Sequence, residues 1–193
     1  MTAVDDRRMT EFFESLEAPE GIKVELLRGE VVMMAGPDWV HNKIVLSVQV
    51  QIPYARWDAL QTQDIAIPGE ASEPQPDLVV IERGAFEGPG RLVPAAAVTL
   101  VVEVVSKTSV DRDYGRKRSI YAAGRIPGYL IIDPMEAQCV LLTEPQGKGD
   151  EADYMVERIV AFADPVPLGD LLDIKLDTGE FRTLPPLKRR RRP

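Results

Sequence analysis

The chain is poor in the residues on which several classes of functional site depend, because it holds one cysteine and one histidine among its 193 residues. Cys139 cannot form an internal disulfide, and its setting in "AQCVLL" favours a small strand residue in a reducing compartment. The sequence also lacks Cys/His zinc spacing, a Walker-type glycine loop and a G-x-S-x-G motif. A papain-like dyad would have to join distant residues without a supporting motif.

Long hydrophobic runs are also missing. No run approaches the roughly 20 apolar residues that a membrane helix needs. The segment "MTAVDDRRMTEFFESLEAP" has no apolar core of the kind found in signal peptides. The sequence therefore predicts no membrane association and a cytoplasmic location.

Positive charge is in deficit over most of the chain. There are 23 basic and 31 acidic residues, which gives a net charge of −8. The tail "KRRRR" (188–192) holds five of the basic residues, so the rest of the chain carries 18 against 31, or −13. Such an acidic body repels phosphate backbones at long range. A role on nucleic acid would need bound cations, a local basic face or the tail, and the tail is either a disordered solubilising end or an interaction segment.

The apolar content is sufficient for one globular domain, with 45% hydrophobic and 28% charged residues. We expect a helical lead-in at 1–20, a single domain at 21–184 and a disordered basic tail at 185–193. A hairpin is predicted around Arg28 and Gly29. Apolar spacing predicts a helix from 40 to about 60, which Pro53 ends or kinks.

The second half of the chain reads as strands around one helix. "DLVVIER", "VTLVVEVVS" and "GYLIIDP" read as strands, with a helix at roughly 109–123 between the last two. "QCVLLTE", "YMVERIVAF" and "LLDIKL" read as further antiparallel strands. The order of elements predicts an α/β (α+β) fold with mixed strand pairing and packed helices.

Glu103 interrupts the most hydrophobic strand, "LVVEVV". A run of this kind is typical of a strand buried on both faces, where an ionised carboxylate is costly unless it is paired or bound to metal. Alternatively, Glu103 lies near an edge and reaches water, or forms a structural salt bridge.

Lys117 is placed to meet Glu103. If the helix after the strand folds back along it, Lys117 lies ~12 Å along the helix at 1.5 Å per residue. Glu103 lies ~10 Å back along the strand at ~3.3 Å per residue. Tyr114 and Tyr121 share the helical face of Lys117. The alternative for Lys117 is an exposed helix lysine.

Asp77 opens the strand in "QPDLVVIER". If that strand pairs beside the Glu103 strand, two carboxylates converge and repel each other. A bound Mg²⁺ or Mn²⁺ relieves the repulsion, because hard cations prefer oxygen ligands. With an adjacent lysine, the group forms a site for metal-assisted hydrolysis. The alternative for Asp77 is a turn residue before a strand.

These segments carry a resemblance. "PDLVV", "VVEVVSKTS" and "DYGRKRSIYAAGRIPGYLIIDP", with "VELLRGEVVMM" and "HNKIV" upstream, resemble the Uma2 family, formerly a domain of unknown function, over roughly residues 21–176. That family belongs to the PD-(D/E)XK nuclease superfamily of restriction-endonuclease-like proteins. The resemblance implies a mixed central sheet flanked by helices, with an additional antiparallel β region.

The resemblance also implies roles for particular residues. The superfamily pattern places lysine two positions after the glutamate, where this chain has Val105, and the lysine is implied to have moved to Lys117. Asp77 and Glu103 would then bind the metal, with the carbonyl of Val104 as a further ligand. Lys117 would orient the attacking water or stabilise charge on the phosphate.

Three further residues are supporting candidates. His41 matches a histidine of the family pattern, and its alternative is a structural role. Glu25 could supplement the metal site from a neighbouring strand or face solvent. Tyr121 shares the helical face of Lys117.

The resemblance therefore implies a divalent-metal-dependent endonuclease, with Mg²⁺ or Mn²⁺ as the cofactor, DNA as the substrate and a homodimer as the assembly. The alternative is a catalytically inactive binding or assembly module of the same fold, which the acidic body favours.

Overall fold

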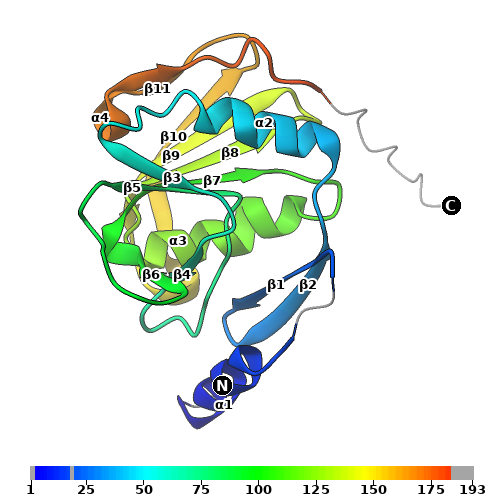
Figure 1. Cartoon of the computed structure of the whole chain (residues 1–193), viewed down its shortest axis with the longest axis vertical. Helices are drawn as coiled ribbons and strands as arrows, with labels where there is room; N and C mark the ends of the chain where they lie inside the picture. Colours follow the sequence, from blue (N-terminus) through cyan, green and yellow to red (C-terminus); the bar gives the residue numbers. More distant parts are fainter. Residues whose placement is uncertain (1–2, 18–19, 184–193) are drawn as a thin grey trace, which may run out of the picture.

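A computed structural model of the chain describes residues 3–17 and 20–183, and side chains from residue 8 onward (Figure 1). The segment 185–193, for which the sequence predicts a disordered tail, lies outside the described residues. Within the described residues, no helix is long and apolar enough to span a membrane.

Strands make up most of the regular structure. In chain order they are β1 (Ile22–Leu27), β2 (Glu30–Ala35), β3 (Trp57–Leu60), β4 (Asp64–Ala66), β5 (Leu78–Glu82), β6 (Leu92–Pro94), β7 (Val98–Val104), β8 (Gly128–Asp133), β9 (Gln138–Gln146), β10 (Asp153–Ala161), β11 (Val166–Leu168) and β12 (Ile174–Leu176).

The helical elements are fewer and shorter. They are α1 (Ala3–Glu14), α2 (Trp39–Gln49), the 3₁₀ turn η1 (Ala95–Ala97), the π-helical segment η2 (Arg112–Lys117), α3 (Arg118–Ala123), the 3₁₀ turn η3 (Gly149–Glu151) and α4 (Gly169–Leu172). The helix expected at 109–123 is therefore present, but its first half is π-helical.

A six-stranded sheet in the order β10-β9-β8-β7-β5-β3 forms the centre of the molecule. Only the β7–β8 pair in this sheet is parallel, with Leu100 opposite Gly128. A parallel pair needs a crossover connection, and η2 with α3 supplies it. The predicted α/β (α+β) fold with a mixed central sheet is confirmed.

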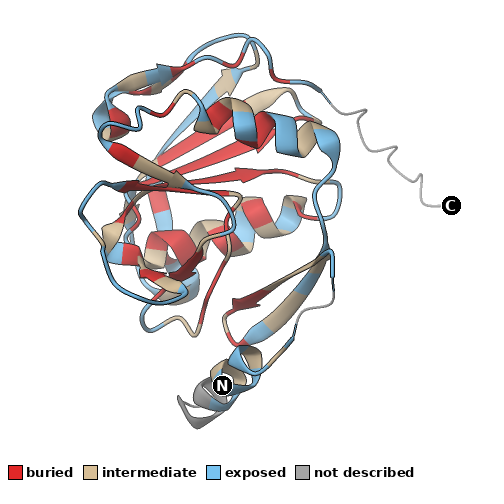
Figure 2. Cartoon of the chain, in the orientation of Figure 1, coloured by how far each residue is buried: buried red, intermediate tan, exposed pale blue. Residues whose placement is uncertain are grey.

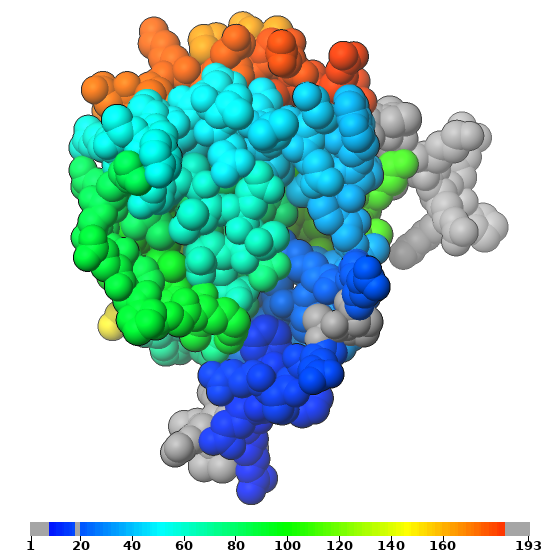
Figure 3. Space-filling view, viewed as in Figure 1, coloured from blue at the N-terminus to red at the C-terminus, as the bar shows by residue number. Residues whose placement is uncertain are grey.

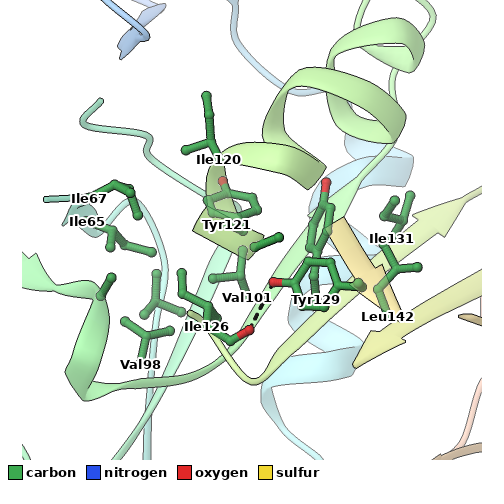
Figure 4. Close-up of a cluster of buried hydrophobic side chains, with 14 of the residues drawn as sticks. Ile65, Ile67, Val98, Val101, Ile120, Tyr121, Ile126, Tyr129, Ile131 and Leu142 are labelled. Carbon is green, nitrogen blue, oxygen red and sulfur yellow. Dashed lines mark hydrogen bonds between the residues drawn. The ribbon is translucent and has the colours of Figure 1, made fainter. Parts of the chain in front are cut away.

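Both faces of the sheet are covered, as expected for a strand as apolar as β7. One hydrophobic cluster packs alternate residues of β5, β7 and β8 against α2, and the other packs the intervening residues against α3. Figure 1 shows α2 and α3 on opposite sides of the sheet, and Figure 2 shows the central strands as the most buried part. Figure 4 shows the cluster beneath α3, which includes Tyr121 and Tyr129.

Two predicted elements differ from the structure, and two strands of the structure were not predicted. The helix predicted from 40 to about 60 ends at Gln49, and β3 (Trp57–Leu60) follows Pro53. This segment pairs with β5, so that Trp57 is buried against the sheet. The stretch read as the strand "LLDIKL" begins as α4, and β6 and β11 lie in segments for which no strand was predicted. Strands of three residues carry too little periodicity to be recognised.

The β1–β2 hairpin forms a two-stranded sheet separate from the main sheet, and it lies beside α1 in Figure 1. Its first strand is tied to the loop before β5, where Leu26 and Glu73 exchange two backbone hydrogen bonds. This link brings β1 close to the ends of β5 and β7.

The single thiol allows a direct test of the core. Cys139 is fully buried on β9, and burial raises the pKa of its thiol to about 12. Only a thiolate attacks a disulfide reagent. We expect no reaction with Ellman's reagent at mildly alkaline pH in the folded protein, and one thiol per chain to react in guanidinium chloride. Rapid labelling of the folded protein would contradict a buried position on β9.

Candidate active site

Asp77 and Glu103 lie on neighbouring strands at the same point of the sheet. β5 and β7 are antiparallel with Leu78 opposite Val102, so the register continued by one residue places Asp77 opposite Glu103. The amide of Val104 donates to Asp77 Oδ2 at 2.8 Å. The expected convergence of the two carboxylates is therefore present, and the Val104 backbone lies beside them.

Lys117 reaches the same point from the crossover helix. Its Nζ lies 2.7 Å from Glu103 Oε1 and 2.9 Å from Glu25 Oε1. Lys117 is 1% exposed and Glu103 is 3% exposed. The contact expected from the rise of the strand and helix is present, and the alternatives of a solvent-facing lysine and a solvent-facing Glu103 are wrong.

Glu25 joins the group from β1. It is fully buried, so the alternative of a solvent-facing strand glutamate is also wrong. Besides Lys117, its Oε1 accepts from the amide of Gln75 at 2.8 Å, while its Oε2 is buried without a hydrogen-bond partner. The carboxylate is thus held between the hairpin, the loop before β5 and the crossover helix.

His41 and Tyr121 each hold one of the two opposed carboxylates. His41 Nε2 lies 2.9 Å from Asp77 Oδ2, and its Nδ1 is buried without a partner. The Tyr121 hydroxyl donates to Glu103 Oε1 at 2.7 Å. Both candidate supporting residues therefore contact the group, one from α2 and the other from α3.

Sequence reasoning missed three residues of the same pocket. Lys23 Nζ lies 3.4 Å from Asp77 Oδ1. Asp113 is 2% exposed on η2, and Arg112 lies beside it. Two spacings could have indicated two of these residues: Lys23 shares a strand face with Glu25 two residues on, and Asp113 lies four residues before Lys117 on one helical face.

The pocket has a cavity volume of about 280 Å³. Its charged lining consists of four carboxylates and four permanent cations: Asp38, Asp77, Glu103, Asp113, Lys23, Lys107, Arg112 and Lys117. The pocket is therefore locally balanced, although the chain as a whole carries −8. An approaching phosphate meets less repulsion here than the net charge implies.

Burial and pairing set the protonation of the group. Burial raises the pKa of Glu103 to about 7, against the lowering effect of the Lys117 charge. Burial also opposes ionisation of Asp77, but Lys23 and His41 outweigh it and lower its pKa. For Lys117, burial lowers the pKa, and the charges of Glu103 and Glu25 outweigh that effect and raise it. Lys117 is therefore an ammonium at neutral pH.

The donor set fits a hard divalent cation. Carboxylate oxygens from adjacent strands face one pocket, and both hydrogen bonds to Glu103 come to Oε1, which leaves Oε2 for another ligand. Among the described residues, no group of three or more His, Cys, Asp or Glu side chains is arranged to hold a metal. A cation bound here would complete its shell mainly with water, of which Mg²⁺ usually keeps several molecules beside one or two carboxylates.

Comparison with known proteins bears on this arrangement. A search of curated proteins found no match. A solved structure described as a "putative nuclease belonging to DUF820 from Anabaena variabilis ATCC 29413" is similar, with a TM-score of 0.64 and 14% sequence identity. The similarity covers 89% of this chain and 96% of that one, and it shows a shared fold. The model of the Uma2 family, described as "Putative restriction endonuclease", matches residues 10–178. The chain therefore belongs to the Uma2 family.

Proposed function

We propose that this chain is a divalent-metal-dependent endonuclease that hydrolyses phosphodiester bonds in DNA. The observation that carries the proposal is the meeting of Asp77, Glu103 and Lys117 in one pocket, from three separate elements. The descriptions of the family and of the similar structure support a nuclease-like function. The choice of DNA rests on analogy with restriction endonucleases.

Asp77 and Glu103 would hold the cation, with the Val104 carbonyl and water as further ligands. When bound, Mg²⁺ or Mn²⁺ would polarise the phosphate and lower the pKa of a bound water. His41 and the Val104 amide orient Asp77 by bonds of 2.9 and 2.8 Å. Tyr121 holds Glu103 by a bond of 2.7 Å, so both carboxylates have defined orientations at the place where the cation would bind.

Lys117 would act as a positive charge and a hydrogen-bond donor. Its raised pKa keeps the ammonium protonated, so it cannot accept a proton from water. It can donate to the attacking oxygen or to a phosphate oxygen as negative charge develops there. Lys23, which is partly exposed and close to Asp77, would offset the charge of the entering phosphate.

Plasmid nicking with purified protein tests the proposal. Wild type is expected to nick supercoiled DNA with Mg²⁺ or Mn²⁺ and to stop when the metal is chelated. Asp77→Asn and Glu103→Gln are expected to remove the nicking, because an amide binds a hard cation more weakly than a carboxylate. Circular dichroism of each variant checks that it remains folded.

Glu82→Gln provides a matched control for a contaminating nuclease. Glu82 is an exposed carboxylate at the far end of β5, paired with Arg56. This variant is expected to nick at the wild-type rate. Nicking that survives in Asp77→Asn and Glu103→Gln would contradict the assigned site.

A catalytically inactive binding module is the second candidate. The net charge of −8 favours it, and so does the absence of a preformed set of three or more metal-ligating side chains among the described residues. Failure of the wild type to cut plasmid, single-stranded DNA or RNA with any divalent metal would select this module. The homodimer and the cytoplasmic location stay predictions.

A further inference from the structure

We propose that the strand cut by this site is unpaired, and that one of its bases stacks on the exposed indole of Trp39. This inference rests on the proposed function and names its substrate class as single-stranded DNA. It follows from the depth of the carboxylates, the charge of the body and an aromatic surface beside the pocket.

The carboxylates lie too deep for a stiff substrate. Glu103 is 3% exposed and the side chain of Asp77 is 13% exposed, within a cavity of about 280 Å³. A scissile phosphate has to enter this cavity to reach both of them. A flexible single strand can bend a phosphate inward, whereas a duplex has to be deformed, and that deformation costs free energy.

Charge favours the same substrate. A DNA duplex carries one negative charge per roughly 1.7 Å, about twice the charge density of one strand. The chain carries −8, and the pocket lining is balanced rather than basic. Long-range repulsion is therefore weaker for a single strand than for a duplex.

Trp39 supplies an exposed stacking surface one residue along the chain from the pocket lining. It is the first residue of α2 and is 67% exposed, and in the sequence it directly follows Asp38 and precedes His41 by two residues, both of which line the pocket. Lys43 Nζ lies 6.0 Å from the centroid of the Trp39 ring. An indole face with an adjacent ammonium is the combination that binds an unpaired base and its phosphate. Bases inside a duplex are already stacked and cannot use it.

A groove extends this surface away from the pocket. It has a volume of about 580 Å³ and runs from Trp39 along α2, where residues 179–182 form its other side. Its charged residues are Lys43, Arg182 and Glu180, which is a net positive lining. Figure 3 shows α2 and the C-terminal part of the described chain adjoining on one face. A strand leaving the pocket over Trp39 would follow this groove.

Fluorescence tests the contact, because Trp39 is exposed while Trp57, the second tryptophan, is 3% exposed. A single-stranded oligothymidylate, titrated without divalent metal, is expected to quench wild-type emission. Trp39→Phe is expected to lose that quenching but bind almost normally. Trp39→Ala is expected to weaken binding by about 5- to 150-fold, the range for removal of one stacked base.

Tyr54→Ala is the matched control. Tyr54 is also exposed, at 72%, but it follows the far end of α2. Its loss is expected to leave both the binding and the quenching unchanged. Binding that is equal in Trp39→Ala and wild type would overturn the inference.

Cleavage of end-labelled single strands and of matched hairpin duplexes with Mn²⁺ separates this inference from the proposed function. We expect wild type to prefer the single strand and Trp39→Ala to lose that preference. Faster cutting of the duplex by wild type would overturn the inference alone. Quenching without any cleavage would overturn the proposed function, and of this inference it would leave only the binding of a single strand at Trp39. Trp39 emission could instead change with protein concentration because two copies of the chain associate through this residue. If Trp39→Ala abolishes such a dimer, a second copy covers Trp39 and the inference fails.

Discussion

Replacing Lys117 by methionine is expected to lower the free energy of unfolding by about 3–5 kcal/mol, the range for breaking a buried ion pair. The ammonium is 1% exposed and neutralises Glu25 and Glu103. Methionine fills a similar volume but leaves the buried Glu103 without its counter-charge, and it leaves Glu25 only the longer ion pair of 3.8 Å with Lys23. Urea unfolding in the absence of divalent metal measures the loss.

The same substitution is expected to reduce metal-dependent cleavage by about 10²–10³-fold, as the loss of one preorganised donor does. Adding Glu25→Gln should recover part of the stability, because one unpaired charge disappears, but none of the cleavage. Lys107→Met is the control, since Lys107 is an exposed lysine at the pocket and should change stability by less than about 0.5 kcal/mol. A Lys117→Met protein as stable as wild type would show that Lys117 is not the counter-charge.

Tyr129→Ala is expected to destabilise the protein by about 3–5 kcal/mol, as the truncation of a buried aromatic residue does. Tyr129 is fully buried on β8, and its ring centroid lies 4.9 Å from that of Tyr121 (Figure 4). Its hydroxyl donates to the carbonyl of Asp113 at 2.9 Å. The residue therefore links the core to the π-helical segment that carries Lys117.

Tyr129→Phe separates packing from hydrogen bonding. It keeps the ring and removes one buried hydrogen bond, which costs about 1 kcal/mol. Tyr54→Phe, at an exposed hydroxyl, should change stability by less than about 0.5 kcal/mol. Urea unfolding followed by circular dichroism gives all three values. A loss of less than about 1 kcal/mol in Tyr129→Ala would contradict the packing of this cluster.

Part of the site could be predicted from the sequence because short connections limit distance. A short connection joins the strand of Glu103 to the helix of Lys117, and the helix folds back along the strand. The fixed rises per residue of strand and helix therefore place the two residues at the same height along the strand. Asp77 could be added because its strand is apolar enough to belong beside β7. The fold class followed from the order of apolar strands and one crossover helix.

Other parts depended on packing between distant segments. Glu25 looks like an ordinary strand glutamate in sequence, and it is buried only because the β1–β2 hairpin bonds to the loop before β5. His41 reaches Asp77 only because α2 packs on the sheet beside β7. Trp57 lies in the last part of the segment for which a helix was predicted up to about residue 60, yet this part pairs with β5 as the edge strand β3.

By itself, the sequence determined the apolar strand around Glu103 and the lysine level with it, because local periodicity and one short connection constrain these positions. For Asp77 it offered only a condition, that its strand pairs beside β7, and the tertiary structure decided this pairing. Only the tertiary structure decided that Glu25, Lys23 and His41 join them in one site. Those contacts span long sequence separations, and they form because the hairpin bonds to the loop before β5 and α2 packs on the sheet, which no local pattern specifies.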